Sequence, residues 1–96
     1  MTSKAQRYAT LLAQVRALAE GETDAIAVMA NISAMVHREF GFWWTGFYIV
    51  RGEELVLGPF QGPVAVLDID SEKLATFDEV DAQWLEKIVT AVPALT

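Results

Sequence analysis

Residues 42–57 read FWWTGFYIVRGEELVL, and this stretch decides the fold. Phe42–Val50 is aromatic and β-branched, which is typical of a central strand. Arg51–Glu54 is polar and contains a glycine, so it predicts a turn, and Leu55–Leu57 returns as a second strand. The stretch therefore predicts an antiparallel hairpin.

Two helices are expected before the hairpin. The first runs from about Ser3 to Glu20, because Ser3 and Gln6 have the spacing of a capping box and the apolar residues recur with a helical period. The second is expected to begin after Thr23 as its cap and to stop at Gly41. Its apolar residues cover more than one side, which predicts packing between a sheet and another helix.

A third strand and a last helix are expected after the hairpin. Pro59 and Pro63 bracket a further turn. Val64–Ile69 alternates between two faces, which is typical of a strand. The segment Thr76–Glu79 has the spacing of a second capping box and opens a helix that ends at about Val92. The order ααβββα predicts an α+β fold, with a three-stranded antiparallel sheet and helices packed on one face.

The composition of the chain limits its number of domains, its classes of partner and the chemistry open to it. The 96 residues suffice for a single domain, 1–96, and 53% of them are hydrophobic. The net charge of −6 argues against a nucleic-acid or anionic-membrane partner. No apolar run approaches the length of a membrane span and no signal-peptide core is visible, so a cytoplasmic location is expected. The chain has no cysteine, which excludes disulfides, thiolate catalysis and sulfur-based zinc sites within it.

Two groups of residues are candidates for binding. Asp68 and Asp70 lie two apart on one face of the third strand, where their carboxylates can converge on a cation; alternatively they form a solvated strand end. Trp43, Trp44 and Tyr48 can form half of an aromatic cage; alternatively at least one of the tryptophans is ordinary core. The single histidine, His37, allows no His–His metal pair, and its place suits the negative end of a helix better. No metal or cofactor is expected.

The acids near the start of the last helix have an equally simple interpretation. Asp78, Glu79 and Asp81 look like a metal cluster, but acidic side chains are also favourable in the first turn of a helix. We therefore expect them to serve that helix.

Three blocks of the chain resemble the GAF-domain family of free methionine-(R)-sulfoxide reductases. Residues 44–48, WTGFY, are similar to its W-x-G-F-Y strand, and residues 54–62, ELVLGPFQG, to its L-x-L-G-P-F-Q-G return. Residues 66–71, VLDIDS, followed by Phe77 and Asp78, are similar to its V-L-D-I-D-S…F-D segment. In the family, a segment of several tens of residues that contains the cysteines separates the second block from the third. Here the two blocks almost adjoin.

The resemblance implies a truncated GAF-like fold and a binding site. Family members reduce free methionine-(R)-sulfoxide with a cysteine thiolate, and thioredoxin regenerates them. By resemblance, Trp44 and Tyr48 match the aromatic contacts to the substrate methyl group, and Asp68 and Asp70 match the acids that hold its ammonium. No residue matches the catalytic cysteines. No other side chain can replace them, because sulfoxide reduction needs a sulfur able to form a disulfide.

The expected function is therefore that of an internally deleted, non-catalytic GAF-like domain. It would self-associate and bind, at most weakly, a small zwitterionic ligand such as methionine or its sulfoxide. The alternative is thioredoxin-dependent reduction of free L-methionine-(R)-S-oxide, if these 96 residues are an incomplete form of the full enzyme's sequence. A natural deletion and an engineered one are equally compatible with the residues.

The resemblance also bears on assembly. In the family fold the strand matching Val64–Ile69 lies beside Phe42–Val50, on the side opposite Leu55–Leu57. Reaching that place means recrossing about 16–17 Å of strand, whereas Phe60–Pro63 spans at most about 13–14 Å. Either the third strand folds back as a local meander, or it passes with the last helix to a second chain as a domain swap, which we favour. Both leave an open strand edge, so a homodimer is expected.

Overall fold

A computed structural model describes residues 3–63 and 78–94 of the chain. Its helices are α1 (Lys4–Ala19), α2 (Ala25–Phe40) and α4 (Glu79–Val89), and its strands are β1 (Thr45–Arg51) and β2 (Glu54–Gln61). The predicted α+β class is confirmed. The predicted third strand, Val64–Ile69, lies outside the described residues. Within the described residues the sheet has two strands.

The first two helices begin and end at polar caps and glycines. The capping box of Ser3 and Gln6 at the start of α1 is confirmed. The cap of α2 is Asp24 rather than the predicted Thr23, because the Asp24 carboxylate accepts hydrogen bonds from the backbone N–H of Ile26 and of Ala27. A carboxylate is also favoured at the positive end of a helix. Gly41 ends α2 in the left-handed region, with φ 66°.

The start predicted for the last helix is wrong. Asp78 caps α4 and forms a capping box with Asp81, whereas the sequence suggested Thr76 and Glu79. The Asp78 carboxylate accepts from the N–H of Asp81 at 3.2 Å, and the Asp81 carboxylate accepts from the N–H of Asp78 at 2.8 Å. Both bonds need the two acids to be three residues apart. The helix ends at Val89, earlier than the predicted Val92.

The hairpin is confirmed, with different bounds. β1 pairs antiparallel with β2, and the register shifts between Gly46 and Tyr48. Across this bulge Phe47 lies opposite two residues, Gly58 and Pro59, so β2 continues through the proline that the sequence assigned to a turn. Proline is tolerated in strands at such irregularities because no ladder hydrogen bond is required of it.

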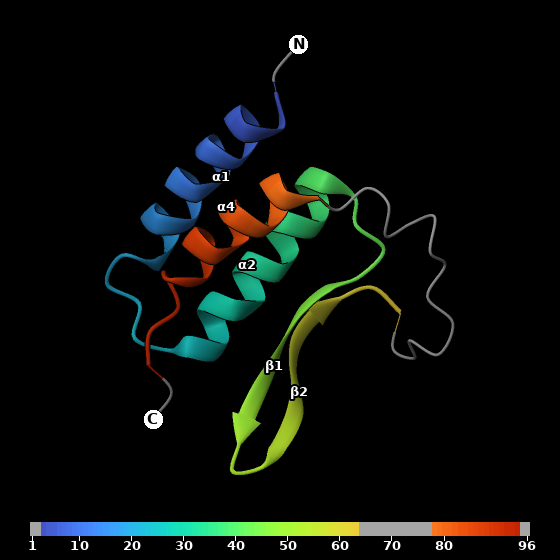
Figure 1. The fold of residues 1–96 in the computed structure, drawn as a ribbon. Coiled ribbons are helices and arrows are strands. Elements are labelled where there is room, and N and C mark those ends of the chain that lie inside the picture. Colours follow the sequence, from blue (N-terminus) through green and yellow to red (C-terminus); the bar gives the residue numbers. More distant parts are fainter. Residues whose placement is uncertain (1–2, 64–77, 95–96) are drawn as a thin grey trace.

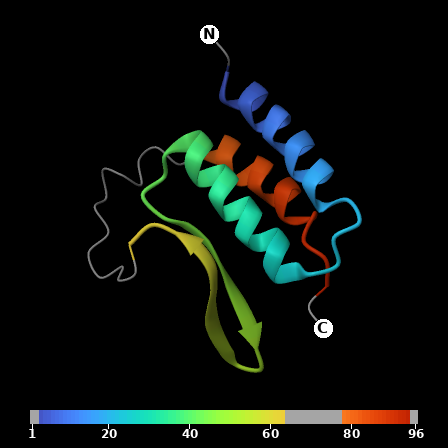
Figure 2. The ribbon, with the colours of Figure 1, turned by 180° about the vertical axis from the view of Figure 1, so that it is seen from behind.

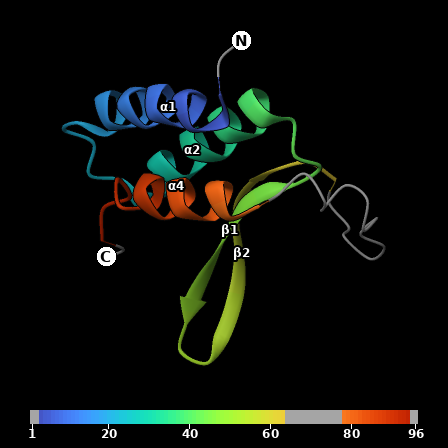
Figure 3. The same cartoon turned by 45° about the horizontal axis from the view of Figure 1, so that its top comes forward.

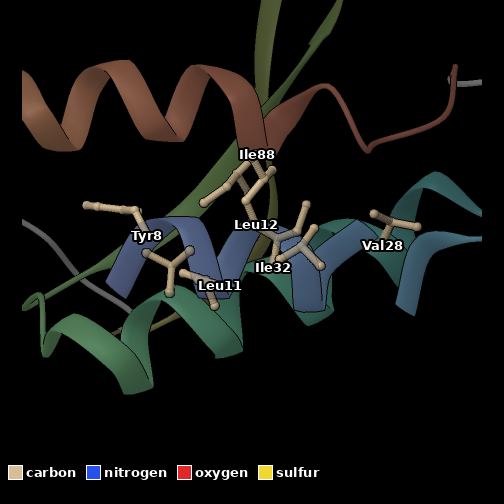
Figure 4. Close-up of a cluster of buried hydrophobic side chains, with 8 residues drawn as sticks. Tyr8, Leu11, Leu12, Val28, Ile32 and Ile88 are labelled. Carbon is tan, nitrogen blue, oxygen red and sulfur yellow. The ribbon is translucent and has the colours of Figure 1, made fainter. Parts of the chain in front are cut away.

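The helices lie on one face of the hairpin, as predicted (Figures 1 and 2). α2 packs on both strands, and α1 packs on α2 and α4. Figure 3 shows that the turn between β1 and β2 extends away from the helices. Two groups of buried side chains fill the interior. The larger joins the three helices (Figure 4), and the smaller joins α2 to β1 through Ala25, Met29 and Ile49.

Candidate functional site

Three aromatic rings gather toward the open end of the hairpin, opposite its turn. The Trp44 ring stacks on the ring of Tyr48 with centroids 5.9 Å apart, and on that of Phe60 with centroids 5.7 Å apart. Trp44 and Tyr48 are four residues apart along nearly extended chain, so their side chains lie on the same side. Phe60 reaches this side because it pairs with Gly46. The structure thus places the two predicted aromatic residues together and adds Phe60, which the sequence analysis assigned to a turn.

Gly46 allows the rings to come this close. A Cβ at this position would lie 2.5 Å from the Cβ of Phe60 and 2.6 Å from the Trp44 ring. Both distances are shorter than carbon atoms tolerate, so no residue with a side chain fits without moving the rings. The aromatic group therefore depends on a glycine inside a strand, where glycine is otherwise unfavourable.

The aromatic group is partly open to solvent. Tyr48 is 56% exposed, whereas Trp44 and Phe60 are half-buried. Ring faces attract cations and methyl groups attached to electron-poor atoms. Trp44 and Tyr48 lie together, as the predicted site requires, and their binding role stays a prediction. Asp68 and Asp70, its acidic half, lie outside the described residues, so their role stays a prediction.

A second polar arrangement, which the sequence analysis missed, joins the two ends of the chain. The fully buried carboxylate of Asp81 accepts hydrogen bonds from the Tyr8 hydroxyl at 2.5 Å and from the Lys4 ammonium at 2.8 Å. Burial alone would raise the pKa of Asp81, but the hydrogen bonds from Lys4, Tyr8 and the Asp78 backbone outweigh it, so the pKa lies below its usual value. Burial and the bond to Asp81 raise the pKa of Tyr8.

This arrangement is structural. Both oxygens of the buried Asp81 carboxylate accept hydrogen bonds from the protein, so neither oxygen is available to a ligand. Tyr8 lies among the buried apolar residues of α1. Its spacing therefore indicated a core residue and not a hydrogen-bond donor. The position of Asp81 was a signal of its burial. It lies one position from Val80 and three from Trp84, which both pack against the core from α4.

Two buried polar atoms have no hydrogen-bond partner in the described part of the chain: Nδ1 of His37 and Oγ1 of Thr45. His37 lies in the last turn of α2, as predicted, and Thr45 opens β1. Neither belongs to a group of metal ligands, because the described residues contain no cluster of three or more acidic, histidine or cysteine side chains able to hold a metal ion. Within 3–63 and 78–94, no helix has the length and apolarity to cross a membrane.

Comparisons with known proteins bear on the family. No family model matches the chain. GAF domain-containing protein A of Dictyostelium discoideum is 32% identical over 143 residues, covering 91% of this chain and 90% of that protein. Free methionine-R-sulfoxide reductase of Escherichia coli is 41% identical over 68 residues, covering 70% of this chain and 41% of the enzyme. A crystal structure from Burkholderia vietnamiensis, described as a GAF sensor protein, superposes with a TM-score of 0.79 at 28% identity, covering 96% of this chain and 89% of that chain.

The fold is that of a small GAF domain, with helices on one face of an antiparallel sheet. The chain belongs to the family of GAF-domain proteins that includes the free methionine-R-sulfoxide reductases. It spans about two fifths of the length of the reductase that it matches.

Proposed function

We propose that residues 1–96 form one GAF-like domain that is non-catalytic, binds a small zwitterionic ligand weakly and self-associates in the cytoplasm. The observation that carries the binding proposal is the stack of Trp44 on the exposed ring of Tyr48, at 5.9 Å. Both residues match the aromatic contacts implied by the family resemblance. Methionine and its sulfoxide are the ligands of choice, because each combines an ammonium with a sulfur-bound methyl group.

An internal deletion accounts for the short chain. The alignment to the Dictyostelium protein runs over 143 residues, which is longer than the 96 residues of this chain, so it contains a gap on this side. The two almost adjoining motifs, at residues 54–62 and 66–71, are where such a gap would fall. The cysteine-bearing part of the family would be lost with it.

The proposal excludes reductase activity for the 96-residue species. Reduction of a sulfoxide by this route needs a thiolate, and the chain has no cysteine. A thioredoxin-coupled assay with methionine-(R)-sulfoxide, on protein of verified intact mass, should show no turnover above the blank. Turnover by a species of that mass would contradict the proposal, whereas a larger mass with turnover would favour the alternative of a full enzyme.

The affinity for a zwitterion should be low. A cation over an exposed ring gains about 0.5–1 kcal/mol, and a solvent-exposed ion pair adds at most about 1 kcal/mol. Since a dissociation constant of 1 mM corresponds to about 4 kcal/mol, binding should be millimolar or weaker. Such a site recognises its ligand only at high concentration.

Titration with methionine and with its sulfoxide, followed by NMR, tests the site. Chemical shifts of Trp44 and Tyr48 should move with millimolar ligand, and Tyr48→Leu should weaken binding about two- to fivefold. Leu18→Ala is the matched control, because Leu18 is similarly exposed but lies on α1, away from the rings. Flat shifts at tens of millimolar ligand, or equal loss in both variants, would contradict the site.

Self-association is the second part of the proposal, and the open hairpin supports it. In the described residues β1 pairs with β2 only, so its other edge has no strand beside it. Isolated two-stranded hairpins are marginally stable, and open edges promote pairing between chains. The described α4 packs on α1 of the same chain. Exchange of α4 and the third strand between two copies therefore stays a prediction, as does the local meander. Light scattering after size exclusion, at up to hundreds of micromolar, tests for the dimer.

A further inference from the structure

Trp84 of α4 stacks on Tyr8 of α1, and this pair differs from Trp44 and Tyr48 in the surroundings of its tyrosine. The rings of Trp84 and Tyr8 have centroids 6.3 Å apart and planes 4° from parallel. Tyr8 is fully buried, whereas Trp84 is half-buried at the edge of the same core. In the other pair it is the tyrosine, Tyr48, that is 56% exposed.

The buried Tyr8 hydroxyl already has a proton acceptor. It donates a 2.5 Å hydrogen bond to Oδ1 of Asp81, whose other oxygen accepts from the Lys4 ammonium at 2.8 Å. Over so short a bond a proton passes to a carboxylate without movement of the heavy atoms. Burial and this bond raise the pKa of Tyr8, so the hydroxyl keeps its proton while the ring is intact. Loss of an electron from the ring makes the same hydroxyl a strong acid, and the carboxylate then takes the proton.

Trp84 lies where an oxidant can reach it. Its ring is half-buried, so a small molecule in solution meets its edge, whereas Tyr8 is closed to solvent. The Lys87 ammonium lies 4.3 Å from the centroid of the Trp84 ring. A positive charge left on Trp84 by the loss of an electron is repelled by that ammonium. An electron supplied by Tyr8 removes the charge, since two stacked rings are close enough to exchange electrons directly.

We propose that Tyr8 is a redox-active residue that is oxidised through Trp84, with Asp81 as its proton acceptor. In the first step a one-electron oxidant of the class of small inorganic radicals takes an electron from the Trp84 ring and becomes an anion. In the second step Tyr8 returns an electron to Trp84, and its hydroxyl proton passes to Oδ1 of Asp81. The products are a neutral Trp84, a neutral Tyr8 phenoxyl radical and a protonated Asp81. A reductant that gives one electron to Tyr8 brings the proton back.

This activity is independent of the ligand site and of self-association, because it uses neither Trp44 nor Tyr48. The two tyrosines should also differ in the lifetime of their radicals. A radical on the exposed Tyr48 can meet and combine with another radical, whereas one on the buried Tyr8 is shielded by the packed helices.

Pulse radiolysis of the full chain with azide radicals tests the transfer, because an azide radical takes one electron and leaves azide ion. Absorption of the tryptophan radical should decay as that of the phenoxyl radical rises. Since the chain has two tyrosines, Tyr8→Phe and Tyr48→Phe assign the signal. The phenoxyl radical of Tyr48→Phe should live about tenfold longer than that of Tyr8→Phe. Circular dichroism verifies that each variant is folded.

A second measurement tests Asp81 without replacing it, because Asp81 also belongs to the capping box of α4. In Tyr48→Phe, conversion of the tryptophan radical into the Tyr8 radical should be about twofold slower in deuterated water, since a proton moves with the electron. Adding Trp84→Phe should slow the appearance of the Tyr8 radical about tenfold. The absence of a phenoxyl signal from folded Tyr48→Phe, or equal rates in the two waters, overturns the proposal. So does a rate that Trp84→Phe leaves unchanged.

Discussion

The Tyr8 hydroxyl donates a 2.5 Å hydrogen bond to Oδ1 of Asp81, and the two residues are 73 positions apart in the chain. Both side chains are fully buried. The bond joins α1 to the first turn of α4, and the Tyr8 ring stacks on Phe40 of α2 with centroids 4.0 Å apart. One side chain therefore fixes the relative positions of the three helices that support the hairpin.

Tyr8→Phe should destabilise the fold by about 1–3 kcal/mol, because it removes one partner of a buried carboxylate without filling the space. Urea denaturation followed by circular dichroism measures the free energy of unfolding. Tyr48→Phe is the matched control, since it removes a hydroxyl from an exposed tyrosine of β1 and should change stability by less than about 0.5 kcal/mol. Equal effects of the two changes would show that the Tyr8–Asp81 bond does not stabilise the fold.

The same carboxylate predicts a dependence of stability on pH. The folded-state pKa of Asp81 lies below its usual value, so its contribution is fully present above about pH 4, the pKa of an unfolded aspartate. That contribution is lost as the pH falls further, through the lowered folded-state value. Asp81→Asn should therefore cost more stability at pH 7 than at pH 3. A difference between wild type and variant that stays constant from pH 7 to pH 3 would contradict the assignment.

The sequence predicted most of the elements because each carries a local signal. The apolar period of α1, the Ser3–Gln6 box and the β-branched run of β1 all act over a few residues. One error arose where distant contacts decide. Pro59 lies in a strand because the bulge opposite Phe47 accommodates it, and its carbonyl accepts a hydrogen bond from the Ser33 hydroxyl.

The candidate site was predictable in part for the same reason. Trp44 and Tyr48 are close in sequence, and alternation along a nearly extended chain puts them on one side. Phe60 joins them only through strand pairing across the bulge, which no local pattern specified. Asp81 likewise appeared to be an acid of a helix first turn, and only packing of α4 on α1 gives it the Tyr8 hydroxyl.

Gly46→Ala should disrupt the aromatic group. The new methyl would lie 2.5 Å from the Cβ of Phe60, so the rings must separate or the strands must part. We expect a loss of about 1–3 kcal/mol in stability, with a change in the near-UV circular dichroism of the tryptophans. Gly58→Ala serves for comparison, because its nearest atom is the Phe47 carbonyl oxygen at 3.1 Å, and its cost should be smaller. An unchanged aromatic spectrum in Gly46→Ala would contradict the stacked arrangement.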